Sequence, residues 1–182
     1  MAGSRRRSGS GACVAQMDTA CTPSMVRQVA VPPAARALCT LARIDYEDAF
    51  LVQIGPVEDR TAEQWARAIL EGAPAVMRRA LLLGWSALGL KLGPTGSDGF
   101  VLGWEVRRST PNVVLLGANS RLGLRAELLF ERQQQRLLFD TFVHKENRIS
   151  RAIWAGVQPL HRPIVRSLLE QASSRERRGR EP

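Results

Sequence analysis

The chain has 182 residues, of which 45% are hydrophobic, and 26 basic against 17 acidic residues give it a formal net charge of +9. This length allows one domain with tails, the composition excludes a wholly disordered chain, and no apolar run is long enough for a transmembrane helix. The charge suggests nucleic-acid binding, but residues 1–40 carry +4, residues 173–182 carry +2, and the long middle part only +3. We therefore expect no specific nucleic-acid partner.

Residues 1–40 are predicted to be a disordered extension, or one that arises from a wrongly assigned start codon. They contain all three cysteines, Cys13, Cys21 and Cys39, and no aromatic residue. The cysteine spacing does not match a zinc site, and the stretch lacks the apolar segment of a secretory signal. We expect a cytoplasmic protein without metal or cofactor, with one domain at 41–172 and a disordered, arginine-rich tail at 173–182.

The first half of the domain predicts one strand followed by two helices. Residues 45–54 alternate loosely between polar and apolar side chains, which is typical of a strand. Thr61 begins a capping-box pattern that places a helix at 62–71, and a second, mostly apolar helix is predicted at 75–88. The glycine-rich stretch 89–99 lacks the order of a phosphate-binding loop and predicts an ordinary loop.

Four more strand-like segments follow, and the short turns between them favour an antiparallel meander. Apolar and polar side chains alternate at 100–108, 124–132 and 136–145, so one face of the sheet is predicted to be buried and the other largely exposed. The segment 112–121 has apolar side chains on both of its faces, so the sequence does not show which face points to the core. The carboxylates predicted on the exposed face are Glu105, Glu127, Glu131 and Asp140.

Residues 147–172 predict a long amphipathic helix that covers the buried face of the sheet. An apolar stripe on its helical wheel opposes a row of arginines, which we interpret as a solvated face. Pro159 and Pro163 lie inside the pattern, so a break or kink is expected near 158–163. The stripe consists of Ile149, Ile153, Val157, Leu160, Ile164 and Leu168, and the arginines are Arg148, Arg151, Arg162 and Arg166.

This order of elements resembles the START-like or helix-grip superfamily (SRPBCC-type), which includes polyketide cyclases and lipid-transfer domains, and within it a bacterial group of uncharacterised proteins. The resemblance covers about 45–172 and implies an α+β fold. A curved antiparallel sheet would wrap around the long C-terminal helix, with two shorter helices between the first and second strands. The full family sheet has seven strands, whereas the segments above give five. The motifs that carry the resemblance are DYEDAF at 45–50, TAEQW at 61–65, GW at 103–104, IWA at 153–155, PLHR at 159–162 and LL at 168–169.

The resemblance implies a cavity between the sheet and the last helix that binds a small hydrophobic molecule, lipid-like or polyketide-like. A solid core built from the same residues is the alternative, and the protein would then be a non-catalytic interaction module. The candidate lining residues are Trp104, Leu128, Phe139 and Thr141 from the sheet, with Ile153 and Val157 from the helix.

The same cavity could instead belong to a cyclase- or aromatase-like enzyme. His161 and Thr141 are the candidates for assisting proton transfer in that case. The other histidine, His144, ends the last strand on the face predicted to be exposed, and we expect it to be an ordinary polar surface residue. No known catalytic motif accompanies these residues.

Overall fold

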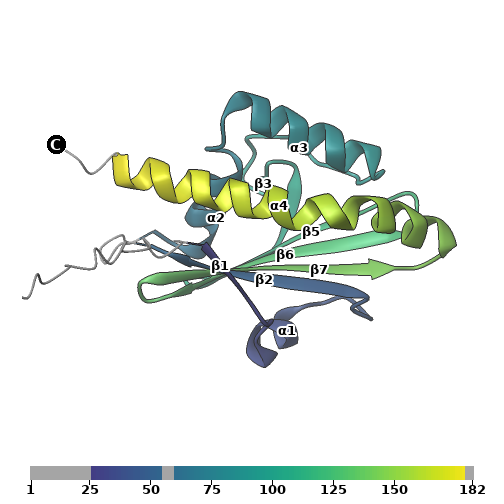
Figure 1. The fold of residues 1–182 in the computed structure, drawn as a ribbon, viewed down its shortest axis with the longest axis horizontal. Helices are drawn as coiled ribbons and strands as arrows, with labels where there is room; N and C mark the ends of the chain where they lie inside the picture. The colour runs from purple at the N-terminus through teal and green to yellow at the C-terminus, as the bar shows by residue number, and fades with distance from the viewer. Residues whose placement is uncertain (1–25, 55–59, 179–182) are drawn as a thin grey trace, which may run out of the picture.

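The computed structural model describes residues 26–54 and 60–178 (Figure 1). Seven strands form one antiparallel sheet in the order β1-β2-β7-β6-β5-β4-β3. The long helix α4 (Arg148–Arg178) crosses one face of the sheet, α2 (Ala62–Leu70) and α3 (Ala75–Ala87) lie on the same side, and α1 (Pro33–Leu38) lies on the other. The strands are β1 (Val26–Val29), β2 (Tyr46–Gln53), β3 (Phe100–Val101), β4 (Trp104–Ser109), β5 (Val113–Asn119), β6 (Leu124–Gln133) and β7 (Arg136–Lys145).

The predicted fold class is confirmed: the fold is α+β, with a curved antiparallel sheet, a long C-terminal helix and two shorter helices between β2 and β3. Two of the seven strands, β1 and β3, are absent from the sequence prediction. None of the helices in the described part of the chain has the length and hydropathy to span a membrane.

The capping box predicted for α2 is present. The Thr61 hydroxyl accepts a hydrogen bond from the Gln64 backbone N–H at 3.3 Å, and the Gln64 side chain accepts one from the Thr61 backbone N–H at 2.8 Å. Two backbone donors that the helix itself cannot satisfy are paired in this way. This pairing explains why α2 begins directly after Thr61.

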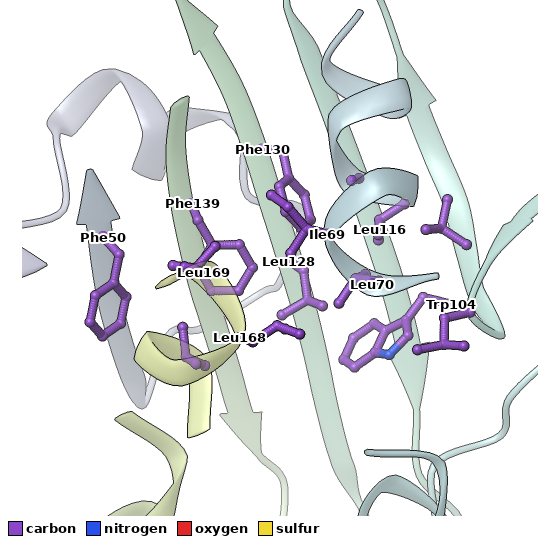
Figure 2. Packing of buried hydrophobic residues seen from close by; sticks show 14 of the residues in the cluster. Phe50, Ile69, Leu70, Trp104, Leu116, Leu128, Phe130, Phe139, Leu168 and Leu169 are labelled. Atoms are coloured by element: carbon purple, nitrogen blue, oxygen red, sulfur yellow. The ribbon is translucent and has the colours of Figure 1, made fainter. Parts of the chain in front are cut away.

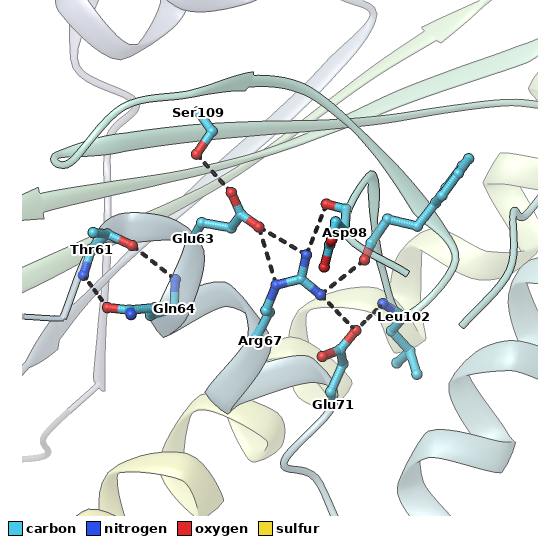
Figure 3. Close-up of polar contacts among 9 residues, drawn as sticks. Thr61, Glu63, Gln64, Arg67, Glu71, Asp98, Leu102 and Ser109 are labelled. Atoms are coloured by element: carbon cyan, nitrogen blue, oxygen red, sulfur yellow. Dashed lines mark hydrogen bonds and ion pairs between the residues drawn. The ribbon is translucent and has the colours of Figure 1, made fainter. Parts of the chain in front are cut away.

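Arg67 ties α2 to the loop before β3 and to β3 itself (Figure 3). Its guanidinium donates to Glu63 at 2.8 Å and to Glu71 at 3.4 Å, each one helical turn away. It also donates to the backbone carbonyls of Asp98 and Phe100, at 3.1 Å and 3.0 Å. These contacts fix the position of α2 relative to the edge of the sheet.

The predicted strand at 100–108 is two strands joined by a tight turn. Leu102 and Gly103 both have positive φ angles, of 46° and 87°, and they reverse the chain between β3 and β4. As a result Val101 pairs with Trp104, and both join the core. One uninterrupted strand over 100–108 would instead have turned Phe100 into the core, because its side chain would share a face with that of Trp104. The predicted assignment of side chains to faces is therefore wrong at the start of this segment.

The structured domain begins before residue 41. β1 pairs with β2 along its whole length, and α1 packs Ala35 against the sheet. The predicted disorder of residues 1–40 therefore does not hold for 26–40, while 1–25 lie outside the described residues. A four-residue strand and a six-residue helix are too short to show a hydrophobic period. At the other end, α4 continues through 173–178, part of the predicted tail.

Both faces of the sheet are buried in its centre. The inner face, toward α2 and α4, carries the main core, which includes Phe130 and Phe139 (Figure 2). The outer face carries a second apolar cluster, covered by α1 and the residues that follow it. Its fully or nearly fully buried members are Ala35, Ala49, Leu115, Leu129, Leu138 and Phe142. β5 is apolar at both parities because it contributes to both clusters.

The prediction of a largely exposed outer face is wrong for two of its four carboxylates. Glu127 and Asp140 are fully buried, whereas Glu105 and Glu131 reach solvent. Glu127 forms an ion pair with Arg107 at 2.5 Å and accepts hydrogen bonds from the backbone N–H and hydroxyl of Thr40. This carboxylate therefore anchors the segment after α1 to the sheet.

α4 is continuous through Pro159 and Pro163, so the predicted break is absent. Both prolines lie on the exposed side of the helix. The buried side is also rotated from the predicted stripe, because Trp154 turns its large ring toward the sheet. Ile149, Leu160 and Ile164 are consequently 60%, 62% and 43% exposed, and the buried apolar residues are Trp154, Val165, Leu168, Leu169 and Ala172.

Candidate functional site

A cavity of about 250 Å³ lies between the inner face of the sheet, α3 and α4. Nearly all of its lining is aliphatic or aromatic. The exposed residues Gly84 of α3, and Leu160 and Ile164 of α4, belong to the lining, so the cavity reaches solvent between these two helices. The sheet contributes Trp104, Ala126, Leu128, Phe139, Thr141 and Val143, and the helices contribute Trp85, Trp154, Val157, His161 and Leu168 among others.

Most residues predicted from sequence for this site lie around the cavity. Trp104, Leu128, Phe139, Thr141 and Val157 line it, and His161 does so as well. Ile153 does not line the cavity, whereas its neighbour Trp154 does. The strand residues share one face of the sheet, as their parity predicts.

Two polar side chains of the lining, Thr141 and His161, lie next to each other in the cavity wall. His161 Nε2 lies 3.3 Å from Thr141 Oγ1 and 3.4 Å from Asp48 Oδ2. Asp48 is opposite Thr141 in the pairing of β2 with β7, which brings its carboxylate to the same place. The Tyr46 hydroxyl donates to Asp48 Oδ2 at 2.5 Å. We call these four residues the polar cluster.

The Asp48 carboxylate is fully buried yet remains the negative charge of the polar cluster. Burial by itself would raise its pKa, but hydrogen bonding and the charge of His161, with hydrogen bonds from Tyr46 and Thr141, lower it below its ordinary value. Burial and the adjacent Asp48 raise the pKa of Tyr46, so its hydroxyl keeps its proton. Arg162, at the surface, donates to the Tyr46 hydroxyl at 3.3 Å.

Aromatic packing holds His161 in place. Its ring centroid lies 5.4 Å from that of Trp154 and 5.8 Å from that of Tyr46, and Tyr46 and Trp154 are themselves in edge contact at 4.9 Å. A carboxylate that pairs with one imidazole nitrogen orients the ring, an arrangement that also suits proton transfer. The other nitrogen, Nδ1, makes no hydrogen bond to any described residue.

Sequence reasoning missed Tyr46, Asp48 and Trp154. A signal for Asp48 was present, because it lies two residues from both Tyr46 and Phe50 and so shares their buried face of β2. A carboxylate at such a position needs partners. His144 is half-buried rather than a free surface residue, since its Nδ1 lies 2.9 Å from Asp45, and it does not line the cavity.

Among the described residues, no group of histidine, cysteine, aspartate or glutamate side chains could hold a metal ion. The family described as "Protein of unknown function (DUF2867)" matches residues 40–168 of the chain. No curated protein and no solved structure matches the chain. The matched range begins just before β2 and ends in α4, so it contains the cavity and the polar cluster.

Proposed function

The chain belongs to the family of unknown function DUF2867, and we propose that it binds a small hydrophobic molecule in the cavity between the sheet, α3 and α4. The observation that carries the proposal is the cavity itself. Close packing is the rule in protein interiors, whereas binding sites are mostly apolar spaces with a few polar groups at one place. An apolar cavity in which the polar side chains of Thr141 and His161 lie together has this composition, which favours ligand binding over an interaction module with a filled core.

We also propose that the family lies within the START-like superfamily and that the protein is cytoplasmic. A seven-stranded antiparallel sheet that curves against a long C-terminal helix supports the first assignment. Cys39, the one cysteine among the described residues, is a free thiol, which agrees with a reducing compartment.

Three tryptophans, Trp85, Trp104 and Trp154, line the cavity and provide the readout for a binding experiment. We expect small apolar aromatic compounds to change tryptophan emission in a saturable way. Ala126 is buried on the floor of the cavity, so Ala126→Phe takes up part of its volume and should weaken binding by about tenfold or more.

Ala155→Phe is the matched control, because Ala155 is exposed on α4 and does not line the cavity. It should bind the same compounds as the wild-type protein does. The proposal would be rejected if Ala126→Phe and Ala155→Phe bound the compounds with equal affinity, or if the wild-type protein showed no saturable binding.

A further inference from the structure

The large apolar side chains that remain exposed are gathered on one side of the molecule. Two lie on α3, three on α4 and one, Leu122, in the turn between β5 and β6. Both helices lie on the same side of the sheet (Figure 1), and the Leu122 carbonyl accepts a hydrogen bond from the Asn147 side chain directly before α4. Single exposed apolar residues are common, whereas a group of them rimmed by polar side chains is typical of an interaction site. In the described part of the chain, the exposed large apolar residues are Val76, Leu83, Leu122, Ile149, Leu160 and Ile164, which we call the apolar patch.

The apolar patch adjoins the opening of the cavity. Leu160 and Ile164 of α4 belong both to the patch and to the cavity lining. On α3, the exposed Ala80 lines the cavity, and Val76 and Leu83 lie four residues before it and three residues after it, on the same face of the helix. No residue of α3 is buried. An apolar surface therefore extends from α3 across the opening of the cavity to α4.

The segments that form this side of the molecule carry a positive charge. Residues 72–97, 119–123 and 147–169 contain eight basic residues and no aspartate or glutamate. The remainder of 41–172 contains nine basic and fourteen acidic residues. The side with the apolar patch is thus basic, whereas the rest of the domain has an excess of acidic residues.

Several arginines of these segments have no acidic partner. Arg79 of α3, and Arg148 and Arg151 of α4, are exposed and form no ion pair with a described residue. These cations are therefore available to an anionic partner. Three of the four acids that border the segments are already paired with other arginines, namely Glu71, Glu146 and Glu170.

An anionic bilayer surface matches both properties of this side of the molecule. Apolar side chains on a helix enter the boundary between head groups and acyl chains, and arginines beside them are attracted by anionic lipids. A second copy of the chain would match the apolar patch, but a symmetric contact would place the arginines of one copy against those of the other. Nucleic acid would match the charge and leave the large aliphatic side chains without apolar contacts.

We propose that the apolar patch and the arginines beside it dock the protein on anionic membrane surfaces, with α3 and α4 against the bilayer. This inference goes beyond the proposed function, because docking requires no ligand in the cavity. The opening between α3 and α4 then faces the apolar interior of the bilayer. A hydrophobic molecule could pass between bilayer and cavity without crossing water, which is the unfavourable medium for apolar surface.

Sedimentation of the full chain with lipid vesicles tests the proposal. One set of vesicles consists of phosphatidylcholine alone, and the other contains about one third phosphatidylglycerol, which is anionic. We expect the protein to bind the anionic vesicles at least about tenfold more tightly than the neutral ones. Binding should weaken when the salt concentration rises from about 0.1 M to about 0.5 M, because salt screens the attraction between the arginines and the lipids.

Substitutions in the apolar patch separate docking from binding in the cavity. Val76 and Leu83 are 81% and 72% exposed and do not line the cavity. Val76→Ser/Leu83→Ser should therefore fold normally and weaken binding to anionic vesicles by about tenfold. The control Val76→Ile/Leu83→Met keeps apolar side chains at both positions and should bind the vesicles as the wild-type protein does. Both variants should keep the wild-type affinity for small aromatic compounds.

Charge reversals test whether the arginines act locally or through the net charge. Arg79→Glu/Arg148→Glu changes two exposed arginines beside the apolar patch and should weaken binding to anionic vesicles by about tenfold or more. Arg108→Glu/Arg136→Glu is the matched control, because it makes the same change in net charge at exposed positions of β4 and β7, outside the segments of the basic side. It should weaken binding by less than about threefold.

Several results would overturn the proposal. The wild-type protein might not bind anionic vesicles, the two charge-reversal variants could lose the same affinity, or Val76→Ser/Leu83→Ser could bind as the wild-type protein does. A wild-type dimer that dissociates in Val76→Ser/Leu83→Ser would assign the apolar patch to an interface between copies of the chain, which also overturns it. If small aromatic compounds bind saturably and the vesicles do not, this inference fails while the proposed function stands.

Discussion

At the scale of single residues, Asp140 has an environment unlike that of any other described carboxylate. It lies in β7 on the outer face of the sheet, and neither of its oxygens has a hydrogen-bond partner among the described residues. Burial, together with the charges of Glu131, Asp48 and Glu47, raises its pKa to about 8. In the unfolded chain its pKa would return to about 4.

The stability of the protein should therefore depend on the protonation of Asp140. Between about pH 4 and pH 8, Asp140 holds a proton in the folded state that it has released in the unfolded state. The free energy of unfolding therefore falls by up to about 1.4 kcal/mol for each unit by which the pH rises. Asp140→Asn removes this titration. Urea unfolding at several pH values should show that the variant loses less stability than the wild-type protein as the pH rises, and that it is the more stable of the two near pH 8.

Asp45→Asn provides the contrast. Burial would raise the pKa of Asp45, but hydrogen bonds from the Lys145 backbone, Arg43 and His144 lower it to about 2. Asp45 is ionised in both states above about pH 5, so its own titration adds no pH dependence to stability from there to pH 8. If Asp140→Asn differs from the wild-type protein by a constant amount over this range, Asp140 does not titrate as we infer.

At the scale of elements, the N-terminal segment is part of the domain. β1 extends the sheet beyond β2, α1 covers the outer apolar cluster, and Thr40 is bound to the buried Glu127. The segment itself contains only short elements. Their contribution comes from burial, because Val26 is fully enclosed in the inner core and Ala35 is fully enclosed in the outer cluster, together with Ala49 and Leu129.

Removal of residues 1–40 should consequently lower the free energy of unfolding by at least about 3 kcal/mol, through exposed apolar surface and the lost partner of Glu127. A chain that begins at Met25 retains β1, α1 and Thr40 and is the matched control. Chemical denaturation of both chains gives the comparison. Equal stability of the two would show that β1 and α1 add nothing to the fold.

The elements that sequence patterns predict well are those long enough to show a period. The strands at β2, β6 and β7 and the helix α4 have eight residues or more. Alternation therefore predicts which strand residues share a face, and the helical repeat predicts α4 as a helix, although its buried side is rotated from the predicted stripe. β1, β3 and α1 have four, two and six residues, too few for a repeating pattern to stand out. Leu102 adopts a positive φ that no glycine marks at that position. The polar cluster could not be predicted because β2, β7 and α4 meet only through tertiary pairing.

At the scale of the whole molecule, one strand pair joins distant parts of the chain. β3 to β7 form a meander of sequential neighbours, whereas β2 pairs with β7 across roughly 80 to 100 residues. Closing so large a loop is entropically unfavourable, and contacts of high sequence separation slow folding. We therefore expect the meander to form first and β2 to join it later.

Two core substitutions test this order. Leu116 in β5 and Val52 in β2 are both buried on the inner face. Leu116→Ala should mainly slow folding, and Val52→Ala should mainly speed unfolding, in stopped-flow experiments. The reverse assignment would mean that the pairing of β2 is already present in the transition state.

The sheet ends in a four-residue strand on one side and a two-residue strand on the other. Short edges offer few unpaired backbone groups to a neighbouring molecule, which protects a sheet against strand addition and aggregation. Without β1, the eight-residue β2 would become the edge, and its apolar residues Phe50 and Val52 would lie on a long, unprotected strand. The small strand that opens the described fold thus limits self-association as well as extending the sheet.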